Sequence, residues 1–332
     1  MNKAKQLKKL ISDPKRIVIT THRGPDGDAM GSSLALFHFL KSLGHTVNVI
    51  TPNAYAEFLH WLPGNNAVIV YDENENFAND ITSSAELIFL LDFSDLGRIS
   101  TFANSVKISD ATKIMIDHHQ DPDESIAELI FSDTKSCSTA QLVYEIIDSM
   151  NMLQQITLSI AECLYVGIMT DTGSFKYAST TSKTHNVVAA LIDAGVDNSK
   201  IHDLIYDNSS ASRIKLLGYC LNEKLRIYSS KSSAIISLNA EELSKFEFKK
   251  GDTEGFVNYA LGIKGIKFAV FIAEKDGVVK LSLRSKGNIK VNDIANEYFQ
   301  GGGHTNASGG ISQVSVDETI KILEKIINNL NN

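Results

Sequence analysis

Short runs of β-branched and other apolar residues recur through the first half of the chain, and longer segments with apolar residues every three or four positions lie among them. The short runs have the length of strands, and the longer segments have the spacing of helices. Alternation of the two is typical of a parallel sheet covered by helices. The predicted strands are 16–20, 46–50, 67–70, 87–91 and 113–116, and the predicted helices are 29–43, 138–150 and 158–169.

The second half of the chain has a different pattern. Segment 183–223 is almost entirely helical in its spacing, which suits a connector. Strand-like runs, a short helix, a glycine cluster and a final helix follow it, and together they predict a second, smaller α/β unit. We therefore predict an α/β fold with a parallel-sheet domain at 1–182, a helical connector at 183–223 and a smaller α/β domain at 224–332.

Composition agrees with a folded protein of two domains. The chain has 332 residues, of which 43% are hydrophobic and 21% are charged, and this excludes extensive disorder. Its net charge of −7 argues against binding to long duplex nucleic acid or to an anionic membrane. No apolar run approaches the roughly 20 residues that span a bilayer, and no signal peptide is recognisable. Three widely spaced cysteines indicate free thiols, so we expect a cytoplasmic protein.

The first candidate chemistry follows the first predicted strand, where His22, Asp26 and Asp28 fall within seven residues. An imidazole and two carboxylates so close together could bind a metal ion. The alternative is a turn followed by a helix cap, because Asp26 precedes a glycine and Asp28 could cap the next helix. The pattern on its own leaves both interpretations open.

Three further acidic positions favour the metal site. Asp92 ends the strand 87–91, Asp117 with His118 and His119 ends the strand 113–116, and Asp171 closes the helix 158–169. A carboxylate at the end of a buried strand is costly unless it is paired, hydrogen-bonded or bound to metal. Carboxylates and imidazoles without thiolates suit Mn²⁺ or Mg²⁺, and two such ions can activate water for attack on a phosphoryl group.

These motifs resemble those of the DHH phosphoesterases, whose name describes the triplet at 117–119. The resemblance implies two divalent metal ions, with Mn²⁺ preferred and Mg²⁺ or Co²⁺ as alternatives. One ion would be held by His22, Asp26 and Asp92, and the other by Asp28, Asp92, His118 and Asp171. Asp92 would therefore bridge the ions. His119 would stabilise charge on the substrate phosphate or protonate the leaving group, and Asp117 would orient His118 from behind.

The glycine cluster at 301–310 would let backbone N–H groups approach a phosphate closely, although a flexible turn is the alternative. Together with the segment around Arg284, it resembles the DHHA1 domain that accompanies one branch of the family. The resemblance implies that this domain binds the substrate, and Arg suits phosphate because its planar fork makes two contacts. The substrate-binding residues implied are Arg284, Ser285, Gly302, Gly303 and His304.

Within the family, the arrangement looks like the nanoRNases, which are oligoribonucleases and 3′-phosphoadenosine-5′-phosphate phosphatases. We therefore expect hydrolysis of short oligoribonucleotides such as pApA and pGpG by a metal-bridged hydroxide, with 3′-phosphoadenosine-5′-phosphate as a further substrate. The alternatives are an exopolyphosphatase and a cyclic dinucleotide phosphodiesterase of the same fold. A noncatalytic nucleotide-binding regulator is a hypothesis of another class, and its mark would be a lost metal ligand. Short RNA is the expected partner, and a homodimer is a further expectation.

Overall fold

A computed structural model describes residues 3–275 and 277–330 and divides the chain into two compact units, Met1–Asn208 and Ser209–Asn332. The predicted connector at 183–223 contains helices on both sides of this division, so its separate role stays a prediction. In the described ranges, none of the helices combines the length and the apolar character needed to cross a membrane.

The first unit is an α/β structure around one parallel sheet, as predicted. The sheet has the order β3-β2-β1-β4-β5-β6, and every neighbouring pair of strands is parallel. Two edge features differ from the prediction: β6 was missed because it is only four residues long and partly exposed, and β3 is shorter than expected. Its elements are α1 (Lys3–Leu10), β1 (Arg16–Thr21), α2 (Gly27–Ser42), β2 (Thr46–Thr51), β3 (Val68–Val70), α3 (Glu75–Ser83), β4 (Leu87–Leu91), α4 (Phe102–Ile108), β5 (Thr112–Asp117), β6 (Leu129–Ser132), α5 (Thr139–Ser149), α6 (Leu158–Asp171), α7 (Ser182–Asp193) and α8 (Asn198–Ile205).

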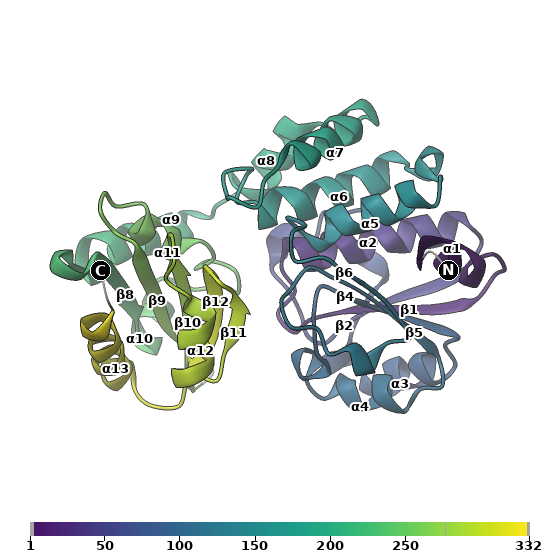
Figure 1. Ribbon diagram of the computed structural model, residues 1–332. Helices are drawn as coiled ribbons and strands as arrows, with labels where there is room; N and C mark the ends of the chain where they lie inside the picture. Colours follow the sequence, from purple (N-terminus) through teal and green to yellow (C-terminus); the bar gives the residue numbers. More distant parts are fainter. Residues whose placement is uncertain (1–2, 276, 331–332) are drawn as a thin grey trace. The chain divides into compact units, whose positions relative to one another are not determined.

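Helices cover both faces of this sheet because its strands are apolar on both sides. Ile17 and Ile19 of β1 join the core beneath α2, α5 and α6, whereas Val18 faces the core formed with α3 and α4. Figure 1 shows these two helical layers, with α7 lying over α6. Continuous apolar strands of this kind are typical of a parallel sheet that is buried on both faces.

The second unit contains a mixed sheet with the order β11-β12-β10-β9-β8-β7, in which only β8 and β9 are parallel. The glycine cluster forms the hairpin β11–β12 rather than a flexible turn. The strands are hard to recognise in the sequence because glycine is uncommon inside strands. Edge strand β7 was also missed. The elements are α9 (Ala211–Tyr219), β7 (Leu225–Tyr228), β8 (Ser233–Leu238), α10 (Ala240–Lys245), α11 (Phe256–Leu261), β9 (Phe268–Lys275), β10 (Val278–Ser285), α12 (Val291–Tyr298), β11 (Gly302–His304), β12 (Ala307–Ser312) and α13 (Val316–Asn329).

Candidate active site

The strand order of the first unit reverses between β1 and β4. In open α/β sheets, ligands bind outside the carboxyl ends of the strands at this point. His22 follows β1 directly and Asp92 follows β4 directly, while His118 follows β5, the next strand along. The topology therefore gathers side chains from three separate motifs at one edge of the sheet.

Two helices bring further carboxylates to the same edge. Asp26, rather than Asp28, caps α2, because its Oδ1 accepts hydrogen bonds from the amides of Asp28 and Ala29 at 3.0 and 3.1 Å. Asp28 lies in the first turn of α2, and Asp171 is the last residue of α6. Gly167 permits the close packing of these helices, since a Cβ there would lie 2.8 Å from Asp28 Oδ1.

Asp92 occupies the centre of the site. Its backbone is left-handed, with φ of 65°, and its side chain is buried. Its Oδ2 lies 3.5 Å from Nε2 of His22, and its Oδ1 lies 3.5 Å from Nε2 of His118. Each oxygen of this single carboxylate therefore faces a different imidazole, which is the arrangement a bridging ligand needs.

The remaining predicted ligands lie around the same two imidazoles. His118 Nε2 is 3.7 Å from Asp28 Oδ2 and 3.5 Å from Asp171 Oδ2, and His22 Nε2 is 3.9 Å from Asp26 Oδ1. Asp92 belongs to every group of side chains, within the described part of the first unit, whose ligand atoms lie close enough together to hold one metal ion. These groups are His22, Asp26 and Asp92; Asp28, Asp92 and His118; and Asp92, Asp117 and His119.

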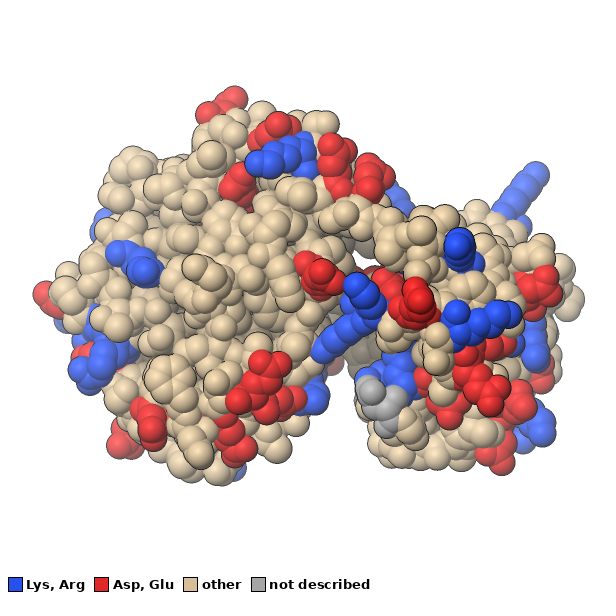
Figure 2. Space-filling model, turned by 180° about the vertical axis from the view of Figure 1, so that it is seen from behind, with Lys and Arg blue, Asp and Glu red and all other residues tan. Residues whose placement is uncertain are grey.

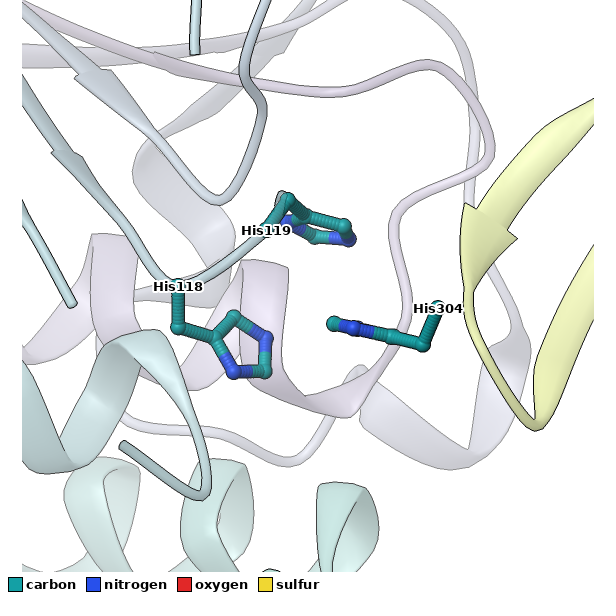
Figure 3. A group of neighbouring side chains, drawn as sticks. All are labelled: His118, His119 and His304. Carbon is teal, nitrogen blue, oxygen red and sulfur yellow. The ribbon is translucent and has the colours of Figure 1, made fainter. Parts of the chain in front are cut away.

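The structure corrects the predicted partner of Asp117. Asp117 Oδ1 accepts a hydrogen bond from His119 Nδ1 at 2.7 Å, whereas Nδ1 of His118 faces the carbonyl oxygen of Ser136 at 3.2 Å. Figure 3 shows the two histidines at consecutive positions after β5, with their rings nearly perpendicular, and it also draws His304 of the second unit on β11. Asp117 therefore orients His119, and a backbone carbonyl orients His118.

Thr139 is a residue of the site that sequence reasoning missed. Its hydroxyl donates to Asp92 Oδ1 at 2.8 Å, and its backbone amide donates to Asp28 Oδ2 at 2.6 Å. The amide of Ala140 donates to the other oxygen of Asp28 at 2.9 Å. The first turn of α5 therefore holds two of the candidate ligands, which the acidic motifs alone could not reveal.

The electrostatics of the cluster follow from crowding buried carboxylates against imidazoles. Burial raises the pKa of Asp28 well above its usual value, and the charges of Asp92 and Asp171 raise it further. Burial also raises the pKa of Asp171, to about 7, against the opposing effect of His118. For Asp92 the cost of burial is outweighed by His22 and the two triplet histidines, so its pKa is lowered. Burial lowers the pKa of His119, but the hydrogen bond to Asp117 and the charge of Asp92 outweigh it and raise the pKa to about 9.

In the second unit, Arg284 and His304 lie in one cross-strand row. Arg284 of β10 and His304 of β11 are both in register with Ala307 of β12, so the three residues share one face of the sheet. Gly303 is required by the backbone, because its φ is 138° and a Cβ would lie 2.7 Å from the Ala307 carbonyl oxygen. At exposed Gly302, by contrast, a Cβ would meet no described atom within 4 Å.

Ser285 points to the opposite face from Arg284. It is buried, its hydroxyl donates to the Ile289 carbonyl at 2.6 Å, and it accepts from Asn306 Nδ2 at 2.8 Å. These bonds attach the loop after β10 to the turn of the hairpin. The structure therefore explains Ser285 by local architecture, and its contact with substrate stays a prediction.

Two parts of the chain match known protein families. Residues 16–168 match the DHH family, N-terminal domain, and residues 233–331 match the DHHA1 domain. The chain belongs to the DHH family, which confirms the resemblance inferred from its motifs.

Among its relatives is the bifunctional oligoribonuclease and PAP phosphatase NrnA of Bacillus subtilis, 29% identical over 324 residues, covering 96% of each chain. A probable NrnA of Streptococcus mutans is 30% identical and covers 94% of each chain. The crystal structure of an exopolyphosphatase-related protein from Bacteroides fragilis has a TM-score of 0.94 and 40% identity, and the match covers 98% of this chain and 95% of that chain.

Proposed function

We propose that this protein is a metal-dependent phosphoesterase that hydrolyses short oligoribonucleotides to nucleoside monophosphates, with 3′-phosphoadenosine-5′-phosphate as a further substrate. The main support for this proposal is the position of Asp92. One of its carboxylate oxygens lies 3.5 Å from Nε2 of His22, and the other lies 3.5 Å from Nε2 of His118. The names of the NrnA relatives, which cover nearly the full chain, support the choice of substrate.

The donor set fits two divalent cations, because it combines carboxylates with imidazoles and contains no thiolate. We assign one cation to His22, Asp26 and Asp92. We assign the second to Asp28, Asp92, His118 and Asp171, and we propose Mn²⁺ as the preferred ion. Such a pair supplies an activated water and neutralises charge on the transferred phosphoryl group.

We assign His119 to the substrate phosphate. Its Nδ1 is engaged by Asp117 at 2.7 Å, which fixes the ring orientation and places the proton of the neutral ring on that nitrogen. A buried carboxylate behind the imidazole also stabilises positive charge on the ring. This arrangement supports a role in stabilising negative charge on the phosphate or in protonating the leaving oxygen.

The second unit is proposed to bind the rest of the substrate through Arg284 and His304, which share a face of the sheet with Ala307. Figure 2 shows one face of the molecule, on which the Lys and Arg side chains of the described residues lie scattered and form no continuous basic surface. A long polyanion would favour such a surface.

A substrate panel with Mn²⁺ tests the proposal. It compares pApA, pGpG, RNA of twenty nucleotides, 3′-phosphoadenosine-5′-phosphate, cyclic dinucleotides, pyrophosphate and polyphosphate. We expect the linear dinucleotides to be hydrolysed fastest, chelator to abolish turnover, and Asp92→Asn to be inactive. Asp80→Asn, which changes an exposed carboxylate on α3, is the matched control and should be fully active.

Exopolyphosphatase activity is the second candidate, and the name of the Bacteroides fragilis relative is the observation that favours it. Faster hydrolysis of polyphosphate than of dinucleotides would establish it in place of the first. Wild-type protein that hydrolyses neither, with any of Mn²⁺, Mg²⁺ or Co²⁺, would overturn both.

A further inference from the structure

One short segment supports three of the candidate metal ligands. Residues 136–140, which we call the β6–α5 segment, lead from β6 into the first turn of α5. The first carbonyl oxygen of this segment lies 3.2 Å from Nδ1 of His118. The amide of Thr139 donates to Asp28 at 2.6 Å, and its hydroxyl donates to Asp92 at 2.8 Å. The geometry of the metal centre therefore depends on where the β6–α5 segment lies.

Cys137 anchors this segment. It directly follows Ser136, whose carbonyl faces His118, and it lies two residues before Thr139. Its side chain is buried, and its thiol donates to the side-chain oxygen of Gln141, with Sγ and Oε1 3.0 Å apart. Because each peptide unit is planar, a displacement of Cys137 also moves the backbone groups on either side of it.

The side chain of Gln141 is diverted from a local capping role. Ser138 and Gln141 have the spacing of a capping box, in which the glutamine side chain returns to the amide of the capping residue. The Ser138 hydroxyl accepts from the Gln141 amide at 3.0 Å, but the Gln141 side chain is directed to Cys137 and to Glu145. Gln141 is only 3% exposed, and a buried amide is costly unless its hydrogen bonds are made. These contacts therefore place the glutamine against Cys137 rather than at the helix end.

Two charged residues fix the orientation of the Gln141 amide. Glu145 Oε1 accepts from Nε2 of Gln141 at 2.8 Å, and Glu145 Oε2 lies 2.7 Å from Nζ of Lys183 on α7. An ionised carboxylate can only accept hydrogen bonds, so it selects the NH₂ group of the glutamine and leaves Oε1 for the thiol. A chain of contacts therefore runs from α7 through α5 to Cys137.

We propose that Gln141 is a positioning residue of the metal centre, which acts through Cys137 and the β6–α5 segment. The segment in turn orients His118 and supports Asp28 and Asp92. This inference rests on the proposed function, because it concerns the affinity of the same metal centre. Its consequence is that metal affinity depends on a neutral buried side chain that acts on the ligands through the backbone.

The first test is Gln141→Met, which keeps the length of the side chain and removes both of its polar atoms. Isothermal titration with Mn²⁺ should show binding weakened by roughly 3- to 10-fold, the effect of about one hydrogen bond. The visible absorption of the Co²⁺-loaded variant should also differ from that of wild type, because it reports ligand geometry. Thr82→Val is the matched control, since it removes a buried hydrogen bond of 2.7 Å to the Ala78 carbonyl on α3 and should leave Mn²⁺ affinity unchanged.

A double-mutant cycle tests whether Gln141 acts through Cys137. Cys137→Ala breaks the same contact from the other side, and it should weaken Mn²⁺ binding by a similar factor even if Gln141→Met fails to fold. The variant with both substitutions should bind Mn²⁺ no more weakly than either single variant, because residues that share one contact have non-additive effects. Cys137→Ser keeps a donor and should restore most of the affinity.

Three outcomes would overturn the positioning role. They are unchanged Mn²⁺ affinity in both single variants, additive losses in the double variant, and an equal loss of affinity in Thr82→Val. Failure of the proposed function is distinguishable, because wild-type protein would then not hydrolyse pApA. The titrations require no turnover, so they test Gln141 whichever phosphoester is the substrate.

Discussion

Replacing Thr139 with Val tests whether the metal centre depends on a residue that carries no charge. The hydroxyl of Thr139 is buried and donates to Asp92 Oδ1 at 2.8 Å, and Val has nearly the same shape without the donor. The backbone amide of Thr139 still reaches Asp28, so the substitution isolates one hydrogen bond. The carboxylate that loses it is the one shared by all the candidate metal groups of the first unit.

The expected magnitude follows from the ionised acceptor. A hydrogen bond to a charged group contributes about 1.5–3 kcal/mol, and loss of a partner that orients a metal ligand typically weakens metal binding roughly 10- to 100-fold. We expect Thr139→Val to weaken Mn²⁺ binding by that factor. At saturating Mn²⁺, kcat should recover much of its wild-type value, because no ligand has been removed.

Isothermal titration with Mn²⁺ measures the change in metal affinity directly. The rise of Tm on adding Mn²⁺ is a second measure that does not depend on activity, because a ligand that binds the folded state stabilises it by mass action. Thr139→Ser keeps the hydroxyl and is the matched control. The reasoning fails if Thr139→Val binds Mn²⁺ as tightly as wild type, or if Thr139→Ser is equally impaired.

Three further predictions follow from the geometry. Asp171→Asn should abolish turnover yet raise Tm of the chelator-treated protein at pH 8. Burial raises the pKa of Asp171 to about 7, so its ionised form is unfavourable in the folded state at that pH. A lower Tm or retained activity would contradict this. Gly167→Ala should lower the free energy of unfolding by about 1–3 kcal/mol in urea titrations, because its Cβ would lie 2.5 Å from the Cβ of Ala140. The control is Gly218→Ala, which should not lower the free energy of unfolding because a Cβ there meets no described atom within 4 Å. The cysteines should resist dithionitrobenzoate at neutral pH until the protein is unfolded, because all are buried and burial raises the pKa of Cys220 to about 12; rapid reaction of the native protein would refute this.

Much of the fold was predictable because it depends on local patterns. The strand Leu87–Leu91 has the predicted bounds, since an apolar run of that length between polar residues has few alternatives. The hairpin of β11 and β12 was not predictable, because glycine has low strand propensity and Gly303 is left-handed. Its stability comes from pairing with β10, a neighbour distant in sequence.

The residue pattern alone was enough to identify most components of the site. Acidic residues and histidines at the ends of buried strands indicate a shared edge, because carboxyl ends of parallel strands meet there. Asp92 and the triplet at 117–119 could therefore be assigned to one cluster.

The contacts between these groups depend on the three-dimensional fold. Asp117 contacts His119 rather than His118, since the direction of each side chain depends on backbone dihedral angles and on the neighbours that pack against it. Thr139 reaches Asp92 from a helix 47 positions away, and Tyr177 lies against Gly173 because three left-handed residues turn the chain back on itself. Such contacts join residues through close packing of separate elements, and packing is a property of the whole fold rather than of any local pattern.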